Sequence, residues 1–414
     1  MSWAAACIGC GFAEGPQPRV DLSSAGNEAR LTTHYLDQAA SSWPKSPAVV
    51  EAMQQALLGA GAAGRGTHRA ARQAEEWVFR CRQQVAIALG VPAASSIALT
   101  TSGTHSLNLA LHGLLRPGDH VVTSAAEHNS VLRPLEWLRL ERNVSFTVVP
   151  CDVEGRVDVT SLLNAIRPDT RLVAMTSASN VTGAVQPIEQ IASALQPGPP
   201  YLLLDVAQSI GYLPLSSVTQ RAALIAAPGH KGLGGPLGTG FLYVRPELQE
   251  FIRPLMQGGT GSASDSLSMP LQFPQRLEAG NLNVPGLAGL SAAVSQWNER
   301  KDGDTSQPWH GPLEQLLAGC ASMPHVRVVG PAWGDEVRAP VVSVTVEGFS
   351  PQDVSAIMEV EFGVLGRGGL HCAAAIHAFL GTEPEGTFRL SLGHATTPAD
   401  VAAALDGLNR LAAG

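Results

Sequence analysis

The chain has 414 residues, of which 45% are hydrophobic and 15% are charged, and its formal net charge is −8. This length and composition predict a folded protein with one large domain and one smaller domain. The acidic balance, the lack of a basic block and the lack of any apolar run near ~20 residues argue against nucleic acid and membrane as partners.

Cysteines are sparse in this chain. A disulfide scaffold needs a denser set, so we expect a reducing, cytoplasmic location. Cys7 and Cys10 form a lone C-x-x-C without a second pair at metal-site spacing, so we expect no metal site. Residues 1–33 are small, polar and interrupted by Gly and Pro, and they lack the basic start of a signal peptide, which predicts an N-terminal arm. The six cysteines are Cys7, Cys10, Cys81, Cys151, Cys320 and Cys372.

Residues 34–300 are expected to form a large α/β domain. Pro47 suits the first turn of a helix that runs to about Leu58, and a longer amphipathic helix carries Trp77 and Cys81 on its apolar face. Short apolar runs then alternate with helical patterns, which predicts a mainly parallel sheet with helices on both faces. The predicted strands are 97–101, 120–123, 145–149, 172–176, 201–205, 222–227 and 240–244.

Residues 301–414 are expected to form a small α+β domain, after a charged stretch that contains Gly and Pro. Residues near 34–60 could also pack against this small domain. Predicted helices are 311–321, 350–361 and 398–411, and predicted strands are 326–329, 341–346 and 387–392.

An acid and a lysine stand at the ends of two successive predicted strands. Asp205 ends one apolar run, Gln208 follows it, and Lys231 comes just after the next run. Glycines around Lys231 let a ligand approach the backbone closely. This pairing suits pyridoxal phosphate, whose aldehyde needs a lysine and whose ring nitrogen needs an acid partner.

Only three lysines are present in the chain. Lys45 lies in a proline-bounded turn and Lys301 lies in a charged cluster. Lys231 alone follows an apolar strand, so it is the candidate for the cofactor lysine, although an ordinary loop cation stays an alternative.

Other polar residues follow the carboxyl ends of predicted strands, where ligands bind in sheets of this kind. The small residues from Thr101 to His105 open a helix, which suits a phosphate but also serves as a helix cap. His128 could lie flat on an aromatic cofactor, and the Asn180 amide could reach a ring oxygen. Each residue alone also fits a structural role; their shared position favours a site.

A glycine-rich loop from Gly366 to Ala373 carries a thiol. Cys372 stands next to His371 and near Arg367, and neighbouring positive charge favours the reactive thiolate. The alternative is a small buried cysteine after a turn.

Together these features resemble the class V aminotransferase-like enzymes, and within them the cysteine desulfurase and selenocysteine lyase group. The resemblance runs from about Tyr35 to the C-terminus and implies a pyridoxal phosphate-dependent transferase of fold type I. It rests on motifs in the family's order: Tyr35-Leu36-Asp37-x-Ala39-Ala40, Arg65-Gly66-x-His68, Glu127-His128, Ser179 to Gly183, Asp205-x-x-Gln208, Gly229-His230-Lys231, Arg276-x-Glu278-x-Gly280 and Arg367-x-Gly369-x-His371-Cys372-Ala373.

The resemblance implies a role for each matching residue. Lys231 would hold the cofactor covalently and move the α-proton of the substrate, Asp205 would keep the ring nitrogen protonated, and His128 would stack on the ring. Asn180 and Gln208 would bond the ring hydroxyl oxygen. The implied phosphate contacts come from Gly103, Thr104, His105, His230 and Asn281.

The substrate contacts are implied in the same way. Arg389 would clamp the substrate carboxylate, a bidentate task that suits guanidinium, and Ala39, Asn180 and Arg367 would line the substrate site. Cys372 would attack the substrate sulfur, leaving alanine and an enzyme persulfide. The resemblance also implies a homodimer and a sulfur-acceptor protein.

Two residues depart from the family pattern. Pro228 stands where a Ser or Thr usually precedes Gly-His-Lys, so it offers neither hydroxyl nor N–H. Asn281 stands where the family has a Thr that reaches the phosphate in the neighbouring subunit. Each lost contact to a charged phosphate costs ~1.5–3 kcal/mol, so we expect weaker cofactor binding.

The expected activity is desulfuration of L-cysteine. Other reactions on the same fold stay open, namely selenocysteine lysis, C–S lysis, transamination and epimerisation, because a fold does not fix its chemistry. A protein that keeps the fold and binds a partner without turnover is a further alternative.

Overall fold

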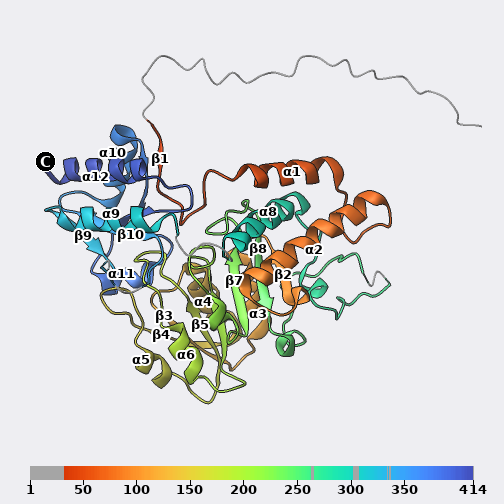
Figure 1. Ribbon diagram of the computed structural model, residues 1–414. Coiled ribbons are helices and arrows are strands. Elements are labelled where there is room, and N and C mark those ends of the chain that lie inside the picture. Colours follow the sequence, from red (N-terminus) through yellow and green to blue (C-terminus); the bar gives the residue numbers. More distant parts are fainter. Residues whose placement is uncertain (1–31, 263–264, 302–306, 333, 335–336, 414) are drawn as a thin grey trace, which may run out of the picture. The chain divides into compact units, whose positions relative to one another are not determined.

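A seven-stranded sheet contains most of the strands in the part of the chain that the structure describes. The computed structural model describes residues 32–262, 265–301, 307–332, 334 and 337–413 (Figure 1). Residues 33–414 form one compact unit. The predicted arm at 1–33, with Cys7 and Cys10, falls outside the described residues except for its last two positions.

The sheet has the strand order β2-β8-β7-β6-β5-β3-β4. All of its strands run parallel except β8, which pairs antiparallel with both β7 and β2. The prediction of a mainly parallel sheet is confirmed, while the reversed strand had no sequence signal. The strands are β2 (Ile97–Thr100), β3 (His120–Ser124), β4 (Ser145–Val149), β5 (Thr170–Thr176), β6 (Tyr201–Asp205), β7 (Leu224–Pro228) and β8 (Gly240–Val244).

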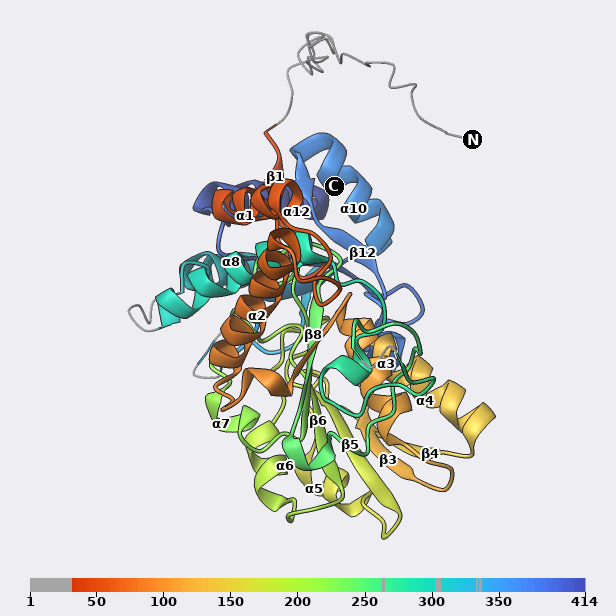
Figure 2. The same cartoon turned by 90° about the vertical axis from the view of Figure 1, so that its right-hand side faces the viewer.

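Both faces of the sheet are buried. Along β6, Leu202 and Leu204 join one apolar cluster whereas Leu203 joins another, because successive side chains of a strand point to opposite faces. This explains why the central strands are continuous apolar runs. Figure 2 shows α3 (Gly103–Leu114) and α4 (Asn129–Arg142) on one side of the sheet and α5 (Val159–Asn164), α6 (Ile188–Ala194) and α7 (Ser216–Thr219) on the other.

Three longer helices pack on one another and complete this part of the fold. Helix α1 (Pro47–Gly59) and helix α2 (Arg69–Leu89) both lie against α8 (Val284–Lys301). The Ser46 side chain accepts a hydrogen bond from the Val49 N–H, and Pro47 occupies the first helical turn. The predicted start of this helix at Pro47 is confirmed, since proline loses no hydrogen bond there.

A second sheet lies in the C-terminal part, with the order β12-β13-β10-β9. It shares a third apolar cluster with helices that include α9, α10 and α12. The division of the chain at residue 301 into two domains stays a prediction. The elements are α9 (His310–Ser322), β9 (Val326–Val329), β10 (Val341–Val346), α10 (Pro351–Phe362), β12 (Arg367–Gly369), α11 (Ala374–Leu380), β13 (Thr387–Ser391) and α12 (Pro398–Ala413).

Two short strands were not among the predicted elements. Strand β1 (His34–Tyr35) pairs in parallel with β11 (Val364–Leu365), so the start of the described chain joins its C-terminal part. The stretch 367–369, expected as part of a loop, is strand β12 and pairs antiparallel with β13. Its glycines hid the strand, since glycine is uncommon in strands. No helix among the described residues has both the length and the apolar character needed to cross a membrane.

Candidate active site

A cavity of about 260 Å³ lies at the carboxyl ends of several strands of the large sheet. Open sheets of this class place their ligand sites there. The cavity gathers most of the site residues predicted from sequence, although they come from segments far apart in the chain. The predicted residues that line it are Ala39, Gly103, Thr104, His128, Asn180, Asp205, Gln208, His230, Lys231, Arg367, Cys372 and Arg389.

The lysine and the acid lie together at the ends of β6 and β7. Asp205 is buried, and its Oδ1 accepts a hydrogen bond from the Ala207 N–H at 2.9 Å. Burial raises the pKa of the Asp205 carboxyl, and the positive charge of Lys231 acts in the opposite direction. Burial lowers the pKa of the Lys231 amine to about 8, while Asp205 partly opposes that shift. Lys231 is therefore more easily neutral, and hence more nucleophilic, than an ordinary lysine.

Residues that follow β1 make hydrogen bonds to the backbone next to Lys231. The His230 carbonyl accepts hydrogen bonds from the Ser42 N–H at 2.8 Å and from the Ser42 hydroxyl at 3.0 Å. The Lys45 ammonium donates to the same carbonyl at 3.3 Å. Lys45 thus supports the backbone next to Lys231 and does not line the cavity.

His128 is the N-cap of α4. Its Nδ1 accepts the Ser130 backbone N–H at 3.0 Å and lies 2.9 Å from the Ser130 hydroxyl, which in turn lies 2.7 Å from the Thr104 hydroxyl. Because a backbone N–H can only donate, the neutral imidazole carries its proton on Nε2. Burial lowers the pKa of His128 to about 4, with Lys231 acting in the same direction, so the ring is neutral at pH 7.

Helix α3 brings its N-terminus to the cavity. The Ser102 hydroxyl accepts the His105 N–H at 3.1 Å, which leaves the first amides of the helix, those of Gly103 and Thr104, for a ligand. Gly103 is required here because an added Cβ would lie 2.9 Å from Cδ of Pro228. The close approach of these two residues brings the helix end next to the end of β7.

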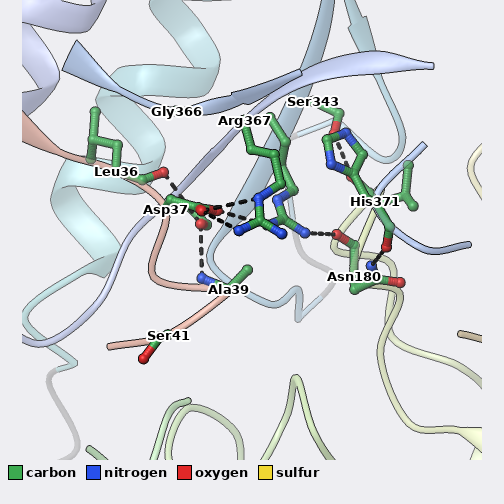
Figure 3. Close-up of polar contacts among 12 residues, drawn as sticks. Leu36, Asp37, Ala39, Ser41, Asn180, Ser343, Gly366, Arg367 and His371 are labelled. Carbon is green, nitrogen blue, oxygen red and sulfur yellow. Dashed lines mark hydrogen bonds and ion pairs between the residues drawn. The ribbon is translucent and has the colours of Figure 1, made fainter. Parts of the chain in front are cut away.

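The residues predicted to bind substrate form an ion-pair cluster. Nη2 of Arg389 lies 2.8 Å from Oδ1 of Asp37, and Nη1 of Arg389 donates to the Asn180 carbonyl at 3.0 Å. Nη2 of Arg367 lies 2.9 Å from Oδ2 of the same aspartate. Figure 3 shows Asp37 beside Arg367, with Asn180 and His371 farther along the same cluster. Arg389 is thereby fixed at two of its three nitrogens.

Cys372 is exposed at the cavity, on a constrained turn. His371 and Cys372 have φ angles of 52° and 56°, in the left-handed region that residues other than glycine rarely occupy. The His371 carbonyl accepts the Asn180 amide at 2.8 Å, and the Cys372 carbonyl accepts the Asn129 N–H at 2.7 Å. These two bonds hold the thiol-bearing turn against the large sheet and α4.

The amides of Asn180 and Gln208 already donate to backbone carbonyls. Asn180 bonds His371, and Gln208 donates to the Ala39 carbonyl at 3.1 Å. Both residues line the cavity. Their predicted contacts to a ring hydroxyl oxygen stay predictions.

Two predicted cofactor residues do not line the cavity. The ring of His105 lies near Thr101, with Nδ1 3.2 Å from the Thr101 hydroxyl. Asn281 is exposed and lies elsewhere. The resemblance assigns position 281 to a neighbouring subunit's phosphate, so its place outside this cavity agrees with that assignment without testing it.

Sequence reasoning missed several residues that belong to the site. Asp37 lies within the motif from Tyr35 to Ala40, but its place in that motif gives no reason to expect an arginine partner. Ser130 had no signal, since serine is common in the first turn of a helix. His371 stood beside Cys372 in the sequence, yet its side chain turns inward, and Nε2 lies 3.0 Å from the Thr387 carbonyl.

The donor set fits pyridoxal phosphate. A buried acid suits a protonated ring nitrogen, an amine with a lowered pKa suits the aldehyde, and a helix N-terminus with the Thr104 hydroxyl suits the phosphate. The cavity wall at Pro228 contributes neither hydroxyl nor N–H, as expected from the sequence.

Several known proteins are similar to this chain in sequence. The family model Aminotransferase class-V matches residues 34–404. A "Probable cysteine desulfurase" of Methanothermobacter thermautotrophicus is 34% identical over 378 residues, covering 89% of this chain and 92% of that protein. A "Cysteine desulfurase" of Serratia proteamaculans is 29% identical and covers 91% of this chain and 93% of that protein.

Solved structures agree in fold. The apo structure of cysteine desulfurase from Thermococcus onnurineus NA1 has a TM-score of 0.85 at 29% identity, covering 92% of this chain and 95% of that chain. The cysteine desulfurase CsdA from Escherichia coli has a TM-score of 0.80 at 28% identity, covering 92% and 94%. The chain belongs to the class V aminotransferase family of pyridoxal phosphate-dependent enzymes.

Proposed function

We propose that the protein is a cysteine desulfurase, which takes sulfur from L-cysteine, releases L-alanine and carries the sulfur as a persulfide on Cys372. The observation that supports this most directly is the position of Cys372. Its exposed thiol lines the same cavity as the cofactor lysine Lys231 and the arginine Arg389. The desulfurases similar to this chain support the same activity.

The substrate carboxylate is bound by Arg389. Its guanidinium is almost fully buried and held in place by Asp37 and the Asn180 carbonyl, so the side chain loses little conformational freedom when a carboxylate binds. The neutral Lys231 amine then takes the α-proton and returns a proton later. When bound, pyridoxal phosphate supplies an electron sink for the carbon from which that proton leaves.

Sulfur transfer is assigned to Cys372. Its thiolate attacks the substrate sulfur, an S–S bond forms and the C–S bond breaks. The electron pair of the broken bond stays on the β-carbon, which takes up a proton to give alanine. The left-handed turn at His371 and Cys372, fixed by Asn180 and Asn129, keeps the thiol at the cavity.

The product of the reaction tests this proposal. Holoenzyme is incubated with L-cysteine under anaerobic, reducing conditions, and alanine, sulfide, pyruvate and ammonia are measured. We expect alanine and sulfide from the wild type, and a loss of both in Cys372→Ala. Cys320→Ala, which removes a buried thiol in α9, is the matched control and keeps activity.

A different outcome would move the assignment. Pyruvate and ammonia that persist in Cys372→Ala would mark a C–S lyase, in which Cys372 is structural. A cofactor absorbance band without any product from cysteine would favour selenocysteine, transamination or epimerisation.

The proposal includes a homodimer and a sulfur-acceptor protein in the cytoplasm. Large apolar side chains remain exposed along the stretch that follows β8, and Asn281 lies beyond the cavity of its own chain, which supports a second copy on this face. We expect twice the chain mass in light scattering, and a monomer at micromolar concentration would contradict it. The exposed side chains are Phe251, Leu255, Met256, Leu267 and Leu271.

A further inference from the structure

The Asp37 carboxylate lies between two arginines at the substrate site. Its Oδ1 is 2.8 Å from Nη2 of Arg389. Its Oδ2 is 2.9 Å from Nη2 of Arg367 and 3.1 Å from Nε of Arg367. One aspartate therefore serves two guanidinium groups, each through a different oxygen. Figure 3 shows this carboxylate at the meeting point of the contacts.

The backbone on both sides of Asp37 is fixed to the strand that carries Arg389. The Ser391 N–H donates to the Leu36 carbonyl at 2.6 Å, and the Ala39 N–H donates to the Ser391 hydroxyl at 2.9 Å. Arg389 and Ser391 are two residues apart on β13 and so project from the same side of that strand. Asp37 is thus part of the framework of the site rather than a mobile surface charge.

Burial differs greatly within this cluster. The side chain of Arg389 is 3% exposed and that of Asp37 is 14% exposed, whereas Arg367 is 47% exposed. A buried guanidinium without a counter-charge is strongly unfavourable, so Asp37 is needed to hold Arg389. Two arginines and one aspartate leave a net charge of +1, which matches a single substrate carboxylate.

We propose that Asp37 sets the charge specificity of the substrate site, holding Arg389 for one carboxylate and offsetting Arg367 so that amino acids with a second negative charge are disfavoured. The inference rests on the proposed function only in that Arg389 receives the carboxylate of an amino acid. It assigns Asp37 as a positioning residue, which touches the two arginines and acts on the substrate through them.

Two ligands of nearly the same shape, one of which carries an additional negative charge, test the proposal. L-aspartate and L-asparagine are titrated into holoenzyme, and their dissociation constants are measured from the change in cofactor absorbance and by calorimetry. In Asp37→Asn the site gains one net positive charge. We expect the ratio of the aspartate constant to the asparagine constant to fall about tenfold, the effect of one unit charge at a partly buried site.

Two more variants separate charge from folding. Arg367→Gln changes an exposed residue and removes one positive charge, so the ratio should rise about tenfold. The double variant Asp37→Asn/Arg367→Gln restores the net charge and should return the ratio to that of the wild type. Asp400→Asn is the matched control. Asp400 of α12 pairs at 2.8 Å with His34, which lies in the same N-terminal segment as Asp37, and neither residue of this pair lines the cavity.

The ratio also gives the result that would overturn the proposal. If Asp37→Asn weakens both ligands equally, or if Arg367→Gln leaves the ratio unchanged, Asp37 acts only in structure. Because Arg367 is exposed, its variant tests the idea even if Asp37→Asn fails to fold. The titration needs no turnover of cysteine. It therefore tests the role of Asp37 even if the protein proves not to be a cysteine desulfurase.

Discussion

The Ser130 backbone N–H donates to Nδ1 of His128 over 3.0 Å, and this contact sets the position of the imidazole proton. A protonated ring would place a proton on Nδ1 facing that N–H. The hydrogen bond that caps α4 therefore also favours the neutral ring. This agrees with the pKa of His128, which burial lowers to about 4. The neutral ring therefore carries its proton on Nε2, and His128 lines the cavity.

The Ser130 hydroxyl should make a separate contribution, since it links His128 to Thr104. In Ser130→Ala the backbone N–H stays and the link is lost. We expect kcat to fall about fivefold, the effect of roughly 1 kcal/mol for one hydrogen bond, with KM for cysteine nearly unchanged. Ser322→Ala removes an exposed hydroxyl that bonds the Gly319 carbonyl and should change neither constant. Unchanged kcat in Ser130→Ala would contradict the role.

The pH dependence of cofactor attachment should report the pKa of the Lys231 amine. Attack on the aldehyde needs the neutral amine, and burial lowers the pKa of this amine from 10.5 to about 8. The rate at which apoprotein gains the cofactor absorbance band should therefore rise with pH, reach half of its maximum near pH 8 and level off above that. Lys45→Met should keep this midpoint, because the Lys45 ammonium donates to the Ser42 hydroxyl and the His230 carbonyl and does not line the cavity. A rate that still rises steeply between pH 9 and 10.5 would show an ordinary lysine.

Glu127 gives a prediction about stability. It is fully buried, its Oε1 accepts from the Ser124 hydroxyl at 2.6 Å and the Thr176 N–H at 2.9 Å, and burial raises its pKa to about 8. The folded state thus binds more protons than the unfolded state between pH 4.5 and 8. Stability from this group is complete below pH 4.5 and is lost as the pH rises towards 8.

Glu127→Gln keeps the carbonyl acceptor and removes the titration. Its free energy of unfolding should approach that of the wild type near pH 5 and exceed it increasingly towards pH 8, by up to about 1.4 kcal/mol per pH unit. Urea unfolding of the apoprotein at several pH values measures this difference. Glu314→Gln, an exposed change on α9, should show no such trend. A difference that stays constant with pH would refute the raised pKa.

The regular elements were readable from sequence because their signals are local. Apolar runs predicted the strands of the large sheet to within a few residues, and Pro47 marked the start of α1. The reversal of β8 and the pairing of β12 were not readable. The direction and the partner of a strand depend on tertiary packing. The glycines at 368 and 369 predicted a loop, whereas pairing with β13 makes this stretch a strand.

The site shows the same division. Lys231, Asp205 and His128 were predictable because cofactor chemistry demands those residue types after strand ends. Asp37 and Ser130 act through partners 352 and 26 positions away, Arg389 and Thr104, and no local pattern encodes such a pairing. His105 belongs to the expected loop, but its ring lies beside the Thr101 hydroxyl, so its contact to the cofactor stays a prediction.

Replacing Pro228 should strengthen the binding of the cofactor. It lines the cavity beside the α3 N-terminus but supplies neither a hydroxyl nor an N–H. Pro228→Ser adds both groups, so cofactor affinity should rise about tenfold or more, in line with ~1.5–3 kcal/mol for a hydrogen bond to a charged group. Pro228→Ala is the matched control, because it regains the N–H alone and should give a smaller gain. The dissociation constant of pyridoxal phosphate from each apoprotein measures the effect, with inorganic phosphate as competitor. Equal constants for all three proteins would mean that the phosphate does not reach the end of β7, and the assignment of the α3 N-terminus as its cradle would fall with it.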